Sequence, residues 1–218
     1  MLKSISTLPA LAMLSVSAPW FFQRLFSYNW YSQPIINGVK AAQFQAGDRL
    51  LELGCGPGNL THHLADQGFD ITGVDKSDAM IAKAKQTQSA AKFQCANAYN
   101  LPFKDAQFDG VISSSLINIV PKPQTMINEI SRVLKPSGRA VLFYPTPEFN
   151  DARANAITNE LGLGFFQSAA LRLWAQKAQK LDAKTLLPML TTAGFKITNT
   201  TMYLQNSQAC IIATKIKV

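Results

Sequence analysis

Short apolar runs separated by turn residues recur along most of the 218-residue chain. Residues 50–53 and 71–75 are two such runs, and each has the length and composition of a buried strand. Between them, Asn59 can cap a helix on which Leu60 and Leu64 lie one turn apart. Strand, helix and strand in this order predict a βαβ unit, and therefore neighbouring parallel strands.

The same pattern predicts elements along the rest of the chain. Further strands are expected at 92–95, 108–115 and 139–145, with a closing antiparallel pair at 196–204 and 208–216. Helices are expected at 34–45, 126–134 and 184–193. Another is expected to begin after Ser77, which can cap it, and two more within 151–180, separated near Gly162. Residues 135–138 are expected to form a type I turn, in which Ser137 needs no special backbone conformation. The pattern as a whole predicts an α/β fold.

The N-terminal segment is apolar but does not predict a membrane span. Pro9 and Pro19 interrupt residues 5–26, and the uninterrupted run is too short to cross a bilayer. A signal peptide is not favoured, because the single Lys3 makes a poor charged region ahead of it. Residues 1–45 therefore predict either a helical lid over the active site, which we favour, or an amphipathic segment on a membrane surface.

A glycine-rich turn follows the strand at 50–53. Gly54, Gly56 and Gly58 stand at alternate positions, whereas a dinucleotide site spaces its glycines as G-x-G-x-x-G to seat a pyrophosphate. The run at 71–75 ends in Asp75, whose carboxylate can accept hydrogen bonds from both hydroxyls of a ribose. Together the two segments predict half of a nucleotide-binding unit, with a glycine spacing that does not suit a pyrophosphate.

Four motifs in order resemble those of the class I S-adenosylmethionine-dependent methyltransferases. They are ELGCGPG at 52–58 with VD at 74–75, NAYNLPF at 97–103, FDGVISSSLINIV at 108–120 and EISRVLKPSGRAVLF at 129–143. The similar group includes ubiquinone and menaquinone C-methyltransferases and many small-molecule methyltransferases. The resemblance implies a doubly wound, mostly parallel seven-stranded Rossmann-like sheet with an antiparallel last strand. It also implies a methyltransferase domain over 46–218, with a helical cap inserted at about 151–180.

The resemblance further implies S-adenosylmethionine as the cofactor, S-adenosylhomocysteine as the product, and no metal. The residues it assigns to the cofactor come from the motifs and from the helix after Asp75: Glu52, Gly54, Cys55, Gly56, Asp75, Lys76, Met80, Asn97, Ala98 and Ser114. Asn97 stands where the family commonly has an Asp. Its side-chain oxygen can still accept a hydrogen bond from the adenine amino group.

The acceptor side is defined less closely. The substrate-binding candidates are Tyr28, Tyr31, Asn118 and Tyr144. A tyrosine ring can make a cation–π contact with a positively charged sulfur, although aromatics at 28–31 can equally serve packing. Asn118 can orient an acceptor or cap the next helix. His62 and His63 point about 100° apart on a helix and cannot chelate a metal together. No residue stands out as a catalytic base; Tyr28, Tyr31, His62 and Tyr144 are the first to test.

Composition and charge bear on compartment and partners. Cys55, Cys95 and Cys210 form no CxxC pair, which favours a reduced, cytoplasmic compartment. The net charge of +8 lies at the two ends, because residues 50–150 carry nine basic and nine acidic side chains. The excess indicates either an acidic partner, such as an anionic membrane, or solubilising charge on exposed helices. Nucleic acid is not favoured, because no aromatic-plus-basic stacking platform is evident.

The sequence therefore predicts an S-adenosylmethionine-dependent methyltransferase acting on a small-molecule or lipid-like acceptor. The alternatives are a non-catalytic S-adenosylmethionine-binding sensor or partner subunit, and an RNA methyltransferase. The enzyme is expected in the cytoplasm, with or without contact between its N-terminus and a membrane surface.

Overall fold

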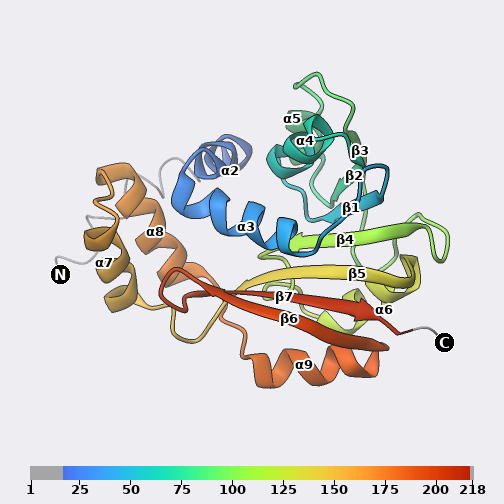
Figure 1. Ribbon diagram of the computed structural model, residues 1–218. Coiled ribbons are helices and arrows are strands. Elements are labelled where there is room, and N and C mark those ends of the chain that lie inside the picture. The colour runs from blue at the N-terminus through green and yellow to red at the C-terminus, as the bar shows by residue number, and fades with distance from the viewer. Residues whose placement is uncertain (1–16, 217–218) are drawn as a thin grey trace.

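A single seven-stranded sheet forms the centre of the protein, in a computed structural model that describes residues 17–216. The strand order is β3-β2-β1-β4-β5-β7-β6, and β7 runs antiparallel to both of its neighbours (Figure 1). The other neighbouring pairs are parallel. The predicted doubly wound sheet with an antiparallel last strand is confirmed.

The elements have the following bounds. The strands are β1 (Arg49–Leu53), β2 (Asp70–Asp75), β3 (Lys92–Cys95), β4 (Phe108–Ser114), β5 (Leu134–Pro145), β6 (Phe195–Tyr203) and β7 (Gln208–Lys215). The helices are α2 (Ala18–Phe26), α3 (Asn29–Ala41), α4 (Asn59–Asp66), α5 (Asp78–Ala84), α6 (Pro123–Val133), α7 (Asp151–Glu160), α8 (Phe165–Lys177) and α9 (Ala183–Thr192). The predicted lid or membrane segment at 1–45 lies partly outside the described residues, since nothing before residue 17 is described; its remainder contains α2 and α3.

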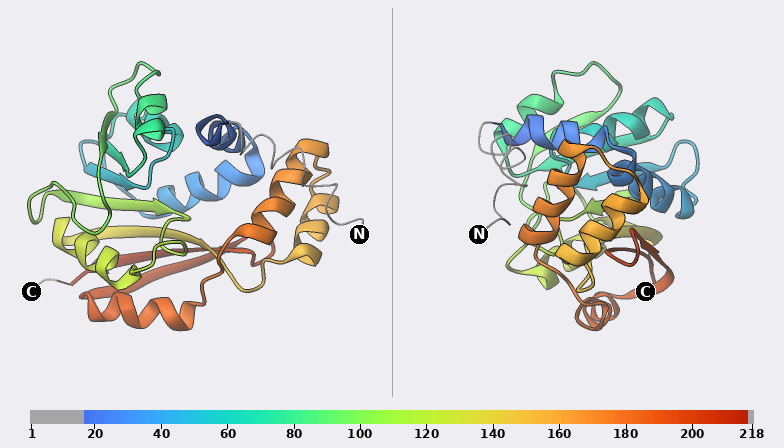
Figure 2. Two further views of the ribbon diagram at one scale, coloured as in Figure 1. Left: turned by 180° about the vertical axis from the view of Figure 1, so that it is seen from behind. Right: turned by 90° about the vertical axis from the view of Figure 1, so that its left-hand side faces the viewer.

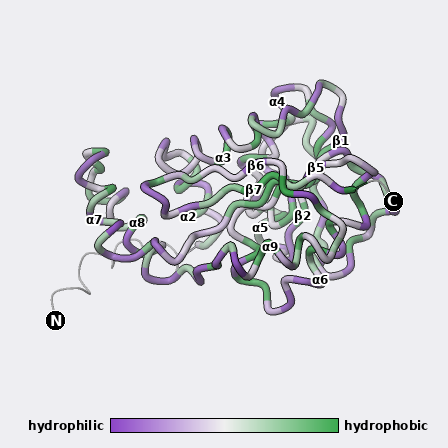
Figure 3. The backbone as a smooth tube through the Cα atoms, turned by 60° about the horizontal axis from the view of Figure 1, so that its bottom comes forward, coloured by the Kyte–Doolittle hydropathy of each residue, from purple (hydrophilic) through white to green (hydrophobic). Residues whose placement is uncertain are grey.

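Successive residues of the central strands pack on opposite faces of the sheet, as the two-residue period of a strand requires. Leu51 and Leu142 join the apolar cluster beneath α6 and α9. Leu50 and Phe143 join the cluster beneath α3 and α4. Helices therefore cover both faces (Figure 2), and the most hydrophobic segments are the strands at the centre (Figure 3).

A third apolar cluster joins α2, α3, α7 and α8 beside the sheet (Figure 1). Trp174 of α8 lies at its centre, with ring centroids 4.7 Å from Phe149, 5.7 Å from Tyr31 and 6.3 Å from Trp30. The two helices expected within 151–180 are present, broken at Gly162, and they pack against the N-terminal helices rather than against the strands. Helices α7 and α8 lie beyond the end of the sheet toward which the parallel strands run, and α3 also covers a face of the sheet (Figure 1).

Two expected helix caps have different outcomes. Ser77 caps α5, because its hydroxyl accepts a hydrogen bond from the Met80 N–H at 3.4 Å. Asn59 is not a cap: Gly58 occupies the N-cap position of α4 with φ of 83°, and Asn59 is the first residue of the helix. The Asn59 amide donates instead to the carbonyl oxygen of Phe22 at 3.4 Å, which ties α2 to α4.

The prediction of a type I turn at 135–138 is wrong, because Ser137 does not have the backbone conformation of that turn. This residue has φ of 65°, in the left-handed region, whereas the third residue of a type I turn has φ near −90°. The chain from Leu134 onward already belongs to β5, and its pairing with β4 shifts register between Phe108 and Gly110. A serine therefore occupies a position whose backbone conformation favours glycine.

No helix within residues 17–216 is long and apolar enough to cross a bilayer.

Candidate cofactor and acceptor site

A cavity of about 890 Å³ lies where β1, β2 and β4 end. Ligands of open α/β sheets bind at this edge, where the strand order reverses direction. All ten residues that the motifs assigned to the cofactor line this cavity. The motifs are local in sequence, and the parallel sheet brings their ends together.

The glycine turn is bonded to the neighbouring strand. The N–H groups of Gly54 and Cys55 both donate to the carbonyl oxygen of Val74, at 2.8 and 2.9 Å. Gly56 borders the cavity with φ of 53°, and a Cβ built on it would meet no protein atom within 4 Å. The backbone thus leaves room for a ligand to approach closely, as a nucleoside cofactor held by this turn would require.

Asp75 is held in one orientation at the end of β2. Its Oδ2 accepts from the Gly56 N–H at 3.0 Å, and its Oδ1 accepts from the Ser77 N–H at 2.9 Å. Each carboxylate oxygen has further acceptor capacity beyond these bonds. The carboxylate is therefore fixed in place and can still accept the two hydroxyls of a ribose.

Glu52 is a buried acid at the same edge, with 5% of its surface exposed. Burial raises its pKa from an ordinary 4.5 to about 8; a hydrogen bond from the Thr61 hydroxyl opposes this, and the charge of Asp75 adds to it. Without a cation nearby, the carboxyl group is mostly protonated at neutral pH. A positively charged ligand in the cavity would favour its ionised form.

The loop after β3 brings Asn97, Ala98 and Tyr99 to the cavity wall. The Asn97 Oδ1 atom already accepts a hydrogen bond from the Tyr99 N–H at 3.0 Å. It keeps acceptor capacity for a second donor such as an adenine amino group. The side chain that replaces the family's usual Asp thus also shapes its own loop.

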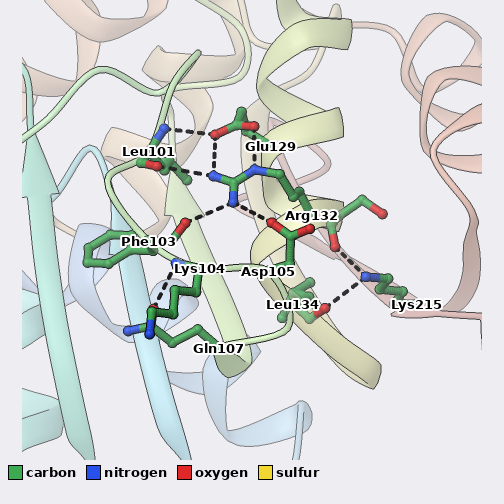
Figure 4. A network of polar contacts seen from close by, with 10 residues as sticks. Leu101, Phe103, Lys104, Asp105, Gln107, Glu129, Arg132, Leu134 and Lys215 are labelled. Atoms are coloured by element: carbon green, nitrogen blue, oxygen red, sulfur yellow. Dashed lines mark hydrogen bonds and ion pairs between the residues drawn. The ribbon is translucent and has the colours of Figure 1, made fainter.

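Arg132 of α6 binds the continuation of this loop, residues 101–105 (Figure 4). Its guanidinium donates to the carbonyl oxygens of Leu101 and Phe103 at 3.1 and 2.8 Å, and to the carboxylate of Asp105 at 2.8 Å. Glu129 accepts from the same guanidinium at 2.7 and 2.8 Å and from the Leu101 N–H at 2.7 Å. These bonds lower the pKa of Glu129 and raise that of Arg132. The network fixes residues 101–105, which continue directly from the cavity wall.

Tyr31 of α3 is the acceptor-side candidate that lines the cavity. Burial raises the pKa of its hydroxyl to about 12, the nearby Ser114 hydroxyl opposes this rise, and the charge of Glu52 adds to it. Ser114 and Ser115 also line the cavity, but Ser113 faces into the sheet, where its hydroxyl donates to Leu53 at 3.0 Å. Of the three consecutive serines at the end of β4, two therefore border the cavity and one does not.

The other candidates lie away from the cavity wall. The Tyr28 ring stacks on Trp30 at 6.4 Å. Asn118 neither caps α6 nor reaches the cavity, and its amide donates to the Gln179 carbonyl at 2.9 Å. Tyr144 is 1% exposed in the cluster beneath α6 and α9. The His62 ring bonds the Ser89 hydroxyl at 2.6 Å and the Ala84 carbonyl oxygen at 3.0 Å, joining α4 to the end of α5 and to the segment that follows it.

Several cavity residues were not predicted from the sequence. They are large apolar side chains of α2, α3 and the segment after β4: Phe22, Phe26, Ile35, Leu116, Ile119 and Val120. No local motif marks Phe22, Phe26 and Ile35, because the tertiary packing of α2 and α3 brings them to the sheet edge. The three residues after β4 belong to a motif, but the motif does not show that their side chains face the cavity. Within residues 17–216, no three His, Cys, Asp or Glu side chains are grouped so that they could hold a metal ion.

Comparison with known proteins agrees with this geometry. A methyltransferase domain is matched over residues 51–142. Demethylmenaquinone methyltransferase from Lactococcus lactis is 36% identical over 166 residues, covering 68% of this chain and 66% of that protein. Ubiquinone biosynthesis O-methyltransferase from Coxiella burnetii is 40% identical over 105 residues, covering 46% and 44%. The chain spans from 19% to 66% of the length of the first curated relatives it matches.

A solved structure shares the fold at lower sequence identity. The S-adenosylmethionine-dependent methyltransferase from Methanosarcina mazei superposes with a TM-score of 0.63 at 22% identity, covering 83% of this chain and 98% of that one. The sheet order and the cavity at its edge define a Rossmann-like nucleoside-binding protein. The matched domain and the ordered motifs then place the chain in the class I S-adenosylmethionine-dependent methyltransferase family. The cofactor of that family is S-adenosylmethionine.

Proposed function

We propose that the protein transfers the methyl group of S-adenosylmethionine to a small-molecule or lipid-like acceptor. The observation that carries the proposal is the meeting of Gly56, Asp75 and Asn97 on the wall of one cavity at the sheet edge. One of the two relatives compared above is named as a demethylmenaquinone methyltransferase and the other as a ubiquinone biosynthesis O-methyltransferase, which supports a small-molecule acceptor. We propose that the reaction takes place in the cytoplasm, with or without contact between the N-terminus and a membrane surface.

Each part of the cavity has a role in this proposal. The glycine turn and Asp75 hold the nucleoside, Asn97 accepts from the base, and Glu52 balances positive charge. When bound, S-adenosylmethionine supplies an electrophilic methyl group for in-line displacement. The protein positions the acceptor beside Ser114 and Tyr31 and excludes water with α2 and α3, so catalysis rests mainly on proximity and orientation.

A second candidate is a protein that binds the cofactor without turnover. It is favoured because the acceptor-side tyrosine of the cavity, Tyr31, is poorly suited to remove a proton at neutral pH, since the pKa of its hydroxyl is about 12. An acceptor whose nucleophile is already activated needs no such base.

Transfer of a labelled methyl group from S-adenosylmethionine distinguishes the two. The full chain is incubated with labelled cofactor and a panel of phenols, catechols, quinols and lipid extracts, with RNA as a further sample. Label in a small-molecule fraction supports the proposal. Label in RNA alone would reassign the acceptor, and tight cofactor binding with no labelled product in any sample would favour the sensor.

A further inference from the structure

The cavity wall outside the residues assigned to the cofactor is largely apolar, and the described residues there include no lysine or arginine. Besides the residues assigned to the cofactor, the large apolar side chains Phe22, Phe26 and Ile35 line it from α2 and α3, and Leu116, Ile119 and Val120 line it from the segment after β4. A volume of about 890 Å³ is near the upper end of the roughly 300–1,000 Å³ of small-molecule sites, which leaves room for an acceptor beside a nucleoside.

The charges on the wall limit what the reacting group can be. Among the described lining residues, the basic side chain is Lys76, which directly follows Asp75 at the cofactor end and is exposed. The acids are Glu52 and Asp75. Away from Lys76, the described wall offers no arginine or lysine to pair with an anionic acceptor group, so desolvating such a group there is unfavourable. The wall therefore suits an uncharged reacting group.

A polar contact for such a group is available at the end of β4. The hydroxyl oxygen of Ser115 is buried, borders the cavity, and has no hydrogen-bond partner in the part of the chain that the structure describes. A buried hydroxyl without a partner is costly, and a ligand hydroxyl or carbonyl would relieve that cost.

The cavity reaches the surface at an apolar rim. Phe22 is 38% exposed and Ile119 is 51% exposed, and both also line the cavity. They come from different elements, α2 and the segment after β4. An apolar chain attached to the acceptor can follow this path outward while remaining in contact with apolar side chains.

We propose that the acceptor is a neutral amphiphile, with an uncharged polar group at Ser115 and an apolar chain that leaves the cavity past Phe22 and Ile119. This inference rests on the proposed function and narrows its substrate class. It excludes acceptors whose reacting group is a free carboxylate. It requires no polar group in the acceptor other than a hydroxyl or carbonyl.

The test measures binding, so it does not depend on having found the natural acceptor. S-adenosylhomocysteine is first titrated into the full chain until its site is saturated, and calorimetry follows the binding. If it does not bind, the proposed function itself is wrong. Phenol and 4-alkylphenols with four, six and eight chain carbons are then titrated into the complex below their aggregation limits. Alkanoates of the same chain lengths are titrated in parallel.

The alkylphenols are expected to bind about three- to fourfold tighter for each added methylene, the value for full burial of that group, until the chain clears the rim. The alkanoates are expected to bind at least tenfold weaker than the matched alkylphenols. If S-adenosylhomocysteine binds but affinity does not depend on chain length, or if the alkanoates bind as well, the inference is wrong while the proposed function stands.

Exposed positions provide the variants, since their substitution leaves the core intact. Phe22→Ser and Ile119→Ser are each expected to reduce the gain in affinity per methylene for the longer chains by about half. The matched control is Trp20→Ser on α2, because Trp20 is 49% exposed and does not line the cavity. An equal loss in the Trp20 variant would show nonspecific adsorption to α2 and would overturn the assigned path.

Discussion

The backbone N–H of Gly56 donates to the Oδ2 atom of Asp75 at 3.0 Å, joining the turn after β1 to the end of β2. The two residues are nineteen positions apart in the sequence. Their contact makes the glycine turn and the acid a single unit, because a shift of either one would move the other. We infer that the carboxylate is oriented before any cofactor binds, which lowers the entropic cost of binding.

Glu52 gives the stability of the protein a defined pH dependence. Its pKa is about 8 in the folded protein and near 4.5 when unfolded. Between these values the folded state binds more protons than the unfolded state, so the free energy of unfolding falls as the pH rises from about 4.5 to 8. Glu52→Gln is expected to flatten this slope in urea unfolding measured across that range. Glu148→Gln, at an exposed ion pair with Arg153, is the control and should leave the slope in place.

The same carboxyl group links cofactor binding to proton release. S-adenosylmethionine is a cation, so its binding should favour ionised Glu52 and release up to about one proton at pH 7. Calorimetry in two buffers of different ionisation enthalpy measures this number. The Glu52→Gln variant should release fewer protons than the wild type at each pH. Equal proton release in both proteins would show that Glu52 does not sense the cofactor's charge.

Arg132 is expected to act on the cofactor site without touching it. Arg132→Met removes the donors to Leu101, Phe103 and Asp105 and leaves Glu129 partly buried without its guanidinium. We expect a loss of about 2 kcal/mol in unfolding free energy and weaker cofactor binding, because the loop that carries Asn97 loosens.

Arg153→Met is the matched control for Arg132. Arg153 makes a single ion pair with Glu148 at 3.6 Å, and this pair should contribute less than about 1 kcal/mol. Chemical denaturation and calorimetry on both variants test the difference. If the two variants lose the same stability and affinity, the network does not support the site.

Ser137 is a position where a substitution should stabilise the protein. Its φ of 65° is unfavourable for a residue with a side chain, and the residue is exposed. Ser137→Gly is expected to raise the free energy of unfolding by about 0.5–1 kcal/mol, after the greater entropy of an unfolded glycine is taken into account. Ser137→Ala keeps the unfavourable conformation and should give no gain. A gain in the alanine variant as large as in the glycine variant would mean that backbone strain is not the cause.

The sequence predicted the sheet, and it named candidate cofactor residues that line one cavity, because both depend on local signals. Gly54, Gly56, Asp75 and Asn97 belong to short motifs that end strands, and parallel strands bring their carboxyl ends to one edge. A single topological rule therefore assembles residues that are far apart in the chain.

The acceptor side could not be predicted in the same way. Tyr144 lies near the end of β5, but adjacent strand residues face opposite sides, and its side chain packs in the cluster beneath α6 and α9. Phe22 and Ile35 reach the cavity through packing of α2 and α3, which no short motif records. Ser137 was misjudged because its turn lies at a register shift between β4 and β5.

The most direct test of the cofactor site is the affinity of S-adenosylmethionine for Asp75→Ala, measured by calorimetry. Asp66→Ala is the control, because Asp66 is exposed at the end of α4 and does not line the cavity. Both variants should show the wild-type circular dichroism spectrum. We expect the Asp75 variant to bind at least about 100-fold more weakly, since two hydrogen bonds to a charged acceptor are lost, and the Asp66 variant to bind normally. Unchanged affinity in a folded Asp75→Ala protein would contradict the assignment of this cavity to the cofactor.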